Sequence, residues 1–374
     1  AAAITVNNSD GTCTANITNN LSNRNKIING GMVCSQRGSS FAAANNMYTL
    51  DRFKIQGSHD GAVTISQSTT SPDGFSKSFK VDVTTADTSI ASGQYIQINT
   101  RPEAQDLQDL AYGTSAAKTI TVSFYVRSNV TGTYTFAIQQ ADNSSKQVSQ
   151  TYTINSADTW ERKTFTFAGD TSGVINDDNG TGFQINWNLA IGSQYTSGTS
   201  RSVWTAYADG DFAAGHTANI LSSTSNEFYI TGVQLEIGSV ATDFEHRSFA
   251  QELLLCRRYA VVWKSKNKVR DYIIPAKVED SDDANTAYET SVQMRSTPSI
   301  VISSADHIKL NYTGGNQNGP VNFSTRTYDD QYENRLFINM DLNSAVLTSG
   351  DMVFLAFTNS TATGTGTFTL DAEL

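Results

Sequence analysis

The chain has 374 residues, which is long enough for two domains of ordinary size, each with its own core. Its formal net charge of −10 argues against a general nucleic-acid binder, which needs a basic face to displace counterions. No run approaches the roughly 18 apolar residues of a membrane span, and the first residues lack the features of a secretory signal, so membrane insertion is not expected. Charged residues are only 17%, and abundant Ser, Thr, Asn and Gly favour short strands joined by polar turns.

Residues 1–25 are small and polar, with a short apolar alternation at Ile4 and Val6. Such a segment cannot form a core alone. It is either an arm that anchors the protein to a neighbouring subunit or platform, or a frayed terminus.

Residues 26–247 show one strand pattern after another. Val122, Phe124 and Val126 alternate with polar neighbours, and Phe136 and Trp187 lie in similar alternating runs. This rhythm predicts a jelly-roll-like β-sandwich. Near its end, the alternation changes phase across Gly232, which indicates a bulge or bend.

Residues 248–260 are expected to form a short linking helix. Ser248 can cap it, and Gln251 stands at the capping-box position. Phe249, Leu253 and Cys256 then fall on one face of the helix, where they are candidates for an oligomer contact.

From residue 261 to residue 374 the strand patterns resume, for example at Ile300 to Ile302 and Met352 to Phe357. A second, smaller β-sandwich is the simplest interpretation of this region. The sequence therefore predicts an all-β fold with two sandwiches joined by one short helix.

Three stretches resemble a widespread family of bacteriophage virion structural proteins, often described as tail-fibre proteins. The junction GVQLEIGSVATDFEHRSFAQELLLCRRY (232–259) matches the end of that family's jelly-roll-like domain. The opening SNRNKIINGGMVCSQRGSSF (22–41), followed by Tyr48 and Asp51-Arg52-Phe53, is similar to the family's opening, and FTLDAEL (368–374) to its C-terminus.

The resemblance implies a non-enzymatic virion protein, assembled in the cytoplasm of a bacterial host and forming a homotrimeric tail fibre or spike. Such a protein would contact other virion proteins and attach to the host surface, where a glycan is a possible receptor. Two alternatives remain open at this stage. One is a head-decoration protein bound to the capsid, and the other is a glycan depolymerase that uses two carboxylates.

No catalytic residue stands out. His59, His216, His246 and His307 lie in none of the known nucleophile or metalloprotease motifs. The three cysteines, Cys13, Cys34 and Cys256, are far apart and odd in number, so buried thiols are expected rather than a disulfide framework.

Asp177 and Asp178 offer oxygen ligands for a calcium ion, but their spacing differs from that of an EF-hand, and capping of backbone groups in a turn is the preferred explanation. No other metal or cofactor is indicated.

Trp204 and Tyr207 are the candidates for glycan binding. They lie in a Gly- and Ser-rich region with little core pattern, and aromatic rings stack on the apolar faces of sugars. The alternative is that both rings plug one end of the sandwich.

Overall fold

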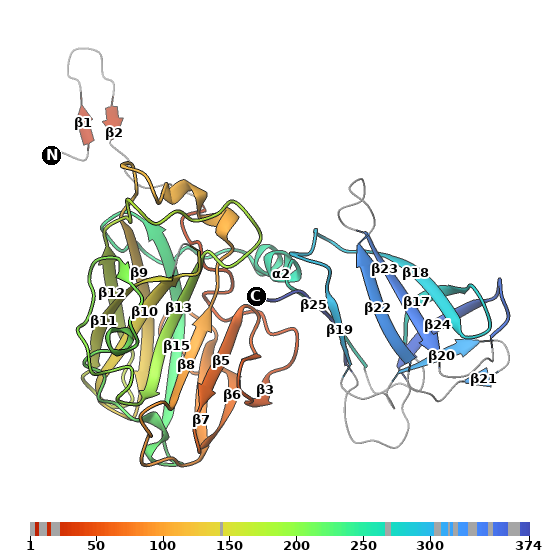
Figure 1. Ribbon diagram of the computed structural model, residues 1–374, viewed down its shortest axis with the longest axis horizontal. Helices are drawn as coiled ribbons and strands as arrows, with labels where there is room; N and C mark the ends of the chain where they lie inside the picture. The colour runs from red at the N-terminus through yellow and green to blue at the C-terminus, as the bar shows by residue number, and fades with distance from the viewer. Residues whose placement is uncertain are drawn as a thin grey trace. The chain divides into compact units, whose positions relative to one another are not determined.

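The computed structural model describes the backbone of residues 4–6, 13–15, 23–142, 145–265, 271–302, 308–312, 315–316, 321–327, 335–342, 347–357 and 367–374. Within these ranges the chain is mostly antiparallel β-sheet with little helix (Figure 1), which confirms the predicted all-β class. It divides into two compact units: residues 1–33 and 39–247 form the first, and residues 34–38 and 248–374 the second. None of the described helices is long and apolar enough to cross a membrane.

The first unit contains two sheets that pack face to face (Figure 1). The seven-stranded sheet has, in spatial order, strands β14 (Thr205–Ala206), β11 (Lys146–Ile154), β10 (Gly132–Gln140), β13 (Phe183–Ile191), β8 (Tyr95–Thr100), β5 (Phe53–Ser58) and β4 (Met47–Tyr48). The six-stranded sheet has β12 (Glu161–Phe167), β9 (Ile120–Ser128), β15 (Glu227–Ile237), β7 (Ser78–Thr85), β6 (Ala62–Ser68) and β3 (Ser40–Ala42).

Short helical segments connect these strands, namely η1 (Ala104–Leu110), α1 (Asp209–Phe212) and η2 (Ile220–Ser222). A separate hairpin near the N-terminus pairs β1 (Ile4–Val6) with β2 (Cys13–Ala15). The rest of the expected arm up to residue 22 lies outside the described residues.

The core of the first unit lies between the two sheets. Successive strand residues point to opposite faces of the sheet, so every second side chain of a strand points into the interior, and these positions are mostly apolar. Phe124 of β9 and Phe136 of β10 meet there with their ring centroids 5.6 Å apart, and Trp187 of β13 packs edge-on against Phe124. All three rings are fully buried.

The phase change across Gly232 is a β-bulge, as the sequence predicts. The register between β15 and β9 shifts between Thr231 and Gln234, and Gly232 has φ 63°. A Cβ at this position would lie 2.7 Å from the ring of Phe75 and 2.9 Å from that of Tyr125. Both the backbone conformation and the space therefore require glycine.

The junction motif, residues 232–247, forms a set of hydrogen bonds that we call the latch. The buried carboxylate of Glu236 accepts from the backbone N–H and the hydroxyl of Thr242, at 2.9 and 2.7 Å, and from the amide of Gln234 at 2.9 Å. The Gln234 amide oxygen accepts from the backbone N–H of Glu245 at 2.8 Å. These bonds fold residues 242–245 back onto the end of β15.

The same latch holds the opening motif. The Glu245 carboxylate accepts from the backbone N–H of Asn25 at 2.8 Å, and Arg247 donates to the carbonyl oxygens of Asn25 and Ile27. Glu245 and Arg247 of the junction motif thus hydrogen-bond the start of the first unit to its end.

The second unit contains a three-stranded and a seven-stranded sheet. The three-stranded sheet has, in spatial order, β16 (Ala260–Lys264), β25 (Thr367–Asp371) and β19 (Ser299–Ile302). The other has β21 (Gly315–Asn316), β20 (Ile308–Tyr312), β24 (Met352–Phe357), β17 (Asp271–Val278), β18 (Asp283–Glu289), β23 (Arg335–Leu342) and β22 (Val321–Thr327). Their apolar side chains form a separate core that includes Ile338, Leu355 and Phe368.

Helix α2 (Phe249–Arg257) opens this second unit after the junction motif. Ser248 accepts a hydrogen bond from the backbone N–H of Gln251, and the Gln251 side chain accepts from the backbone N–H of Ser248, so the predicted capping box is present.

Candidate functional site

The outer face of the seven-stranded sheet in the first unit carries a row of amide side chains. On β5, β8, β13 and β10 the inward residues are large and apolar, whereas the outward ones include Gln56, Gln97, Gln184 and Gln139. The strand register places Gln56 opposite Gln97, and Gln139 opposite Gln184. Four glutamines from four adjacent strands therefore form the floor of one small area.

Aromatic side chains wall this floor. Tyr95 comes from β8, whereas Tyr195, Tyr207 and Phe212 come from the long connection between β13 and β15. The rings support one another: the ring centroids are 5.8 Å apart for Tyr95 and Tyr195, and 6.1 Å apart for Tyr207 and Phe212. Residues 192–212 thus fold over one side of the sheet.

Floor and wall enclose a cleft of about 160 Å³. Its lining contains four amides, three phenols and two apolar side chains, and all of these groups belong to the first unit: Gln56, Tyr95, Gln97, Gln139, Gln184, Ile191, Tyr195, Tyr207 and Phe212. Pockets for drug-sized ligands measure about 300–1,000 Å³, so this cleft suits a smaller group such as one ring of a longer molecule.

Gln97 is the most informative residue of the cleft. Its side-chain nitrogen donates to the amide oxygen of Gln56 at 3.3 Å. Gln97 is only 3% exposed, and its own amide oxygen has no hydrogen-bond partner among the described residues. A buried polar atom without a partner costs about 1–3 kcal/mol, which a ligand with a suitably placed donor would recover.

Two phenol groups of the wall, those of Tyr195 and Tyr207, have a raised pKa. Burial, and then the neighbouring Asp209 carboxylate, raise the pKa of Tyr207 well above its usual value. The pKa of Tyr195 is raised by burial first and by Asp209 next. Asp209 itself accepts a hydrogen bond from the amide of Gln194 at 2.8 Å. The wall therefore presents neutral hydroxyl groups beside one carboxylate.

The structure separates the two aromatic residues selected from the sequence. Tyr207 lines the cleft, whereas Trp204 packs against the core of the first unit, stacked on Phe183 with a centroid distance of 5.6 Å. The indole nitrogen of Trp204 donates to the carbonyl oxygen of Ala168 at 3.0 Å. Trp204 thus takes the structural role that the sequence left open, and it is not part of the cleft.

Asp177 and Asp178 lie exposed in the turn before β13. The carboxylate of Asp178 accepts from the backbone N–H of Gly180 at 2.8 Å, which is the local capping role of an aspartate in a turn. Among the described residues, these two aspartates join no group of three potential metal ligands.

The side chains of α2 that the sequence selects for an oligomer contact are not all exposed in the structure. Cys256 is 1% exposed and Leu253 is half-buried, whereas Phe249 is 60% exposed and the neighbouring Leu254 and Leu255 are exposed as well. The exposed apolar side chains of α2 are therefore Phe249, Leu254 and Leu255, which lie on different sides of the helix.

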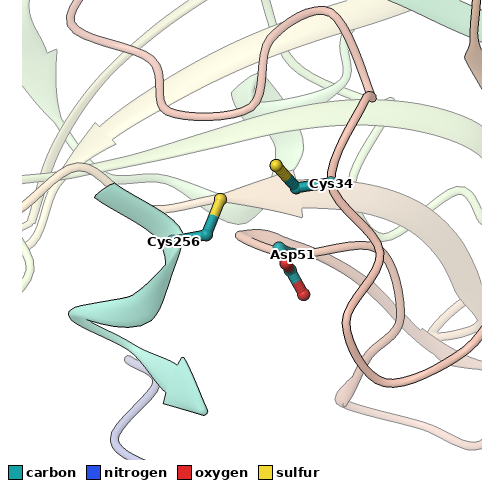
Figure 2. A group of neighbouring side chains, drawn as sticks. All are labelled: Cys34, Asp51 and Cys256. Carbon is teal, nitrogen blue, oxygen red and sulfur yellow. The ribbon is translucent and has the colours of Figure 1, made fainter. Parts of the chain in front are cut away.

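Cys34 and Cys256 of the second unit are both buried, as expected, and the structure does not join them in a disulfide. Figure 2 shows their side chains, together with Asp51 of the first unit; the two sulfur atoms lie within 4.8 Å of each other. The side chain of Cys13 lies outside the described residues.

No protein-family model matches this sequence, and no curated protein does either. Among solved structures, the enzymatically active domain of bacteriophage CBA120 tailspike protein 4 is 12% identical with a TM-score of 0.32, over 57% of this chain and 21% of that chain. A CBM4 structure is 17% identical with a TM-score of 0.28, over 56% of this chain and 98% of that one.

A family 11 carbohydrate-binding module of the cellulosomal cellulase Lic26A-Cel5E of Clostridium thermocellum is 11% identical with a TM-score of 0.28. It is covered over 96% of its length, and it matches 54% of this chain. At these TM-scores the similarities carry no inference about function, so the assignment depends on the residues of the cleft.

Proposed function

We propose that the protein is a component of a phage particle and that its first unit binds a saccharide of the host surface in the glutamine-floored cleft. The observation that carries this proposal is the buried Gln97 oxygen, which has no hydrogen-bond partner in the described part of the chain, beside a cleft walled by Tyr195 and Tyr207. Sugars combine hydroxyl donors with apolar ring faces. A floor of amides beside aromatic rings offers partners to both.

The placement on a phage particle is supported by the sequence resemblance, whose junction residues form the latch at the end of the first unit. We further propose that the protein is a homotrimer in a tail fibre or spike, with the exposed side chains of α2 in contact between copies. Gold-labelled antibodies against the protein should decorate the tail in images of the particle, and decoration of the head would reject the attachment role.

The cleft is proposed as a binding site and not as a hydrolytic one, because its lining is composed of amides, phenols and apolar groups. Glycoside hydrolysis generally uses a pair of carboxyl groups about 5–10 Å apart on either side of the bond that is cleaved.

The test is a titration of purified protein with polysaccharide from the host surface, followed by an assay for released reducing ends. We expect saturable binding without release. Release that follows the protein through purification would replace the binding role with a depolymerase, and absence of any binding would reject the proposed function.

A further inference from the structure

The floor of the cleft is held by a chain of hydrogen bonds whose direction is fixed at both ends. Arg101, which can only donate, gives its Nε–H to the Asn99 amide oxygen at 3.2 Å. The Asn99 nitrogen must then be the donor to Asn186 Oδ1, at 2.6 Å. At the other end, the Asn186 nitrogen donates to the backbone carbonyl oxygen of Gln184 at 3.3 Å, and a carbonyl can only accept.

This chain sets the orientation of Gln184 in the floor. Asn186 Oδ1 also receives the side-chain nitrogen of Gln184 at 3.1 Å, so the nitrogen of this cleft-lining amide is engaged and its oxygen takes no part in the chain of hydrogen bonds. Gln97 has the same arrangement, because its nitrogen donates to Gln56 and its oxygen is without a partner among the described residues. The floor thus offers two acceptors to a ligand.

The charges near the cleft agree with an acceptor-rich floor. Asp209 lies beside Tyr207 in the wall and adds negative potential. Two cations near this face of the sheet are engaged elsewhere: Lys54 donates to Asn46 at 2.9 Å and lies over the ring of Tyr48, and Arg101 donates to Asn99. Neither cation lines the cleft.

We infer that the cleft selects an uncharged, donor-rich sugar ring and rejects acidic sugars. This inference rests on the proposed saccharide binding and adds the class of sugar. A hydroxyl or an acetamido N–H can donate to the oxygens of Gln97 and Gln184. A carboxylate, sulfate or phosphate group offers only acceptors, so it would have no donor for the two amide oxygens, and the nearby Asp209 carboxylate would repel its charge.

An array of matched oligosaccharide pairs tests this inference. The members of each pair end in a neutral hexose or in the corresponding uronic acid, so that they differ only by a hydroxymethyl group or a carboxylate. For every pair that binds at pH 7, we expect the uronate to bind at least about tenfold more weakly, because like-charge and acceptor–acceptor contacts oppose it. Asp209→Asn should reduce the ratio between the affinities for the neutral sugar and for the uronate, and added salt should reduce this ratio as well.

Equal or tighter binding of the uronate would overturn this inference and would leave saccharide binding itself intact. If no member of any pair binds, and host polysaccharide does not bind in a separate titration, the proposed function fails and this inference fails with it.

Discussion

Gln97 of β8, which lines the cleft, donates its side-chain amide to Gln56 of β5 at 3.3 Å, directly across the strand pair, and its buried oxygen has no hydrogen-bond partner among the described residues. The two residues occupy outward positions of strands whose inward residues form the core. One glutamine thus orients the other, and the sheet keeps an acceptor in place before any ligand arrives.

Replacing Gln97 with Met should separate binding from stability. Methionine is close to glutamine in volume and removes the buried oxygen, so the free energy of unfolding should stay the same or rise by up to about 1 kcal/mol. Saccharide affinity should fall by about tenfold or more, because the ligand loses a buried hydrogen bond. Urea denaturation and calorimetric titration measure the two effects.

Gln108→Met is the matched control for this change. The Gln108 amide donates to the carbonyl oxygens of Ala104 and Asn176, away from the cleft, so this variant should keep its affinity and lose some stability. If Gln97→Met and the parent protein bind the saccharide with equal affinity, Gln97 does not contribute to the binding site.

Tyr207 and Trp204 should give opposite phenotypes. Trp204→Ala removes a ring stacked on Phe183 and should lower the free energy of unfolding by up to about 3 kcal/mol, the lower end of the range for a large aromatic residue because it is only partly buried. Tyr207→Ala should weaken saccharide binding by about 1–3 kcal/mol, as loss of ring stacking does elsewhere, with a small change in stability. A folded Trp204→Ala variant that fails to bind would contradict this division.

Glu236→Ala should break the latch at the end of the first unit. It leaves the part-buried Thr242 backbone N–H without its acceptor and removes one of the acceptors of the Gln234 amide nitrogen, which keeps Thr242 and Asp243, at a cost of about 1–3 kcal/mol. Glu236→Gln keeps one acceptor oxygen, so its free energy of unfolding should lie between those of Glu236→Ala and the parent protein. A urea midpoint unchanged in Glu236→Ala would show that the junction motif does not stabilise the fold.

Stability should fall between about pH 6.5 and pH 4 because of His216. Burial lowers the pKa of His216 to about 4, and the ring is held between the Thr135 hydroxyl and the Ala218 carbonyl oxygen. The unfolded chain binds a proton below pH 6.5 and the folded chain does not until about pH 4, so acid favours unfolding. The loss across this window is about 3 kcal/mol. His216→Gln should flatten the profile, and an equally steep profile in that variant would assign the effect to other groups.

The exposed side chains of α2 should matter for assembly. Phe249→Ser together with Leu254→Ser removes apolar area that the proposed trimer would bury, and should shift the sedimentation of the protein from trimer to monomer. Val240→Ser, which is also exposed but lies outside the helix, should leave the trimer intact. A parent protein that sediments as a monomer would reject the proposed trimer.

Periodicity and capping predicted much of the fold. The alternation of Val122, Phe124 and Val126 specifies which face is buried, because side chains on a strand alternate. Ser248 and Gln251 specify the start of α2 through backbone groups only three residues away. In each case the determining contact is local in sequence.

The cleft could not be predicted in the same way. Gln56 and Gln184 are far apart in sequence, and each occupies an outward strand position that a solvated surface would also fill with a polar residue. Only strand order and register bring them together. Tyr207 and Trp204 looked alike in sequence, because no periodicity in residues 192–212 distinguishes a ring facing the cleft from one facing the core.

The structure of the protein with a bound oligosaccharide from the host surface would test the central claim most directly. We predict a sugar ring beside Tyr195 and Tyr207, with a hydroxyl or N–H group within hydrogen-bond distance of the Gln97 amide oxygen. A saccharide bound at another surface, with the cleft between Gln97 and Tyr207 left empty, would contradict it.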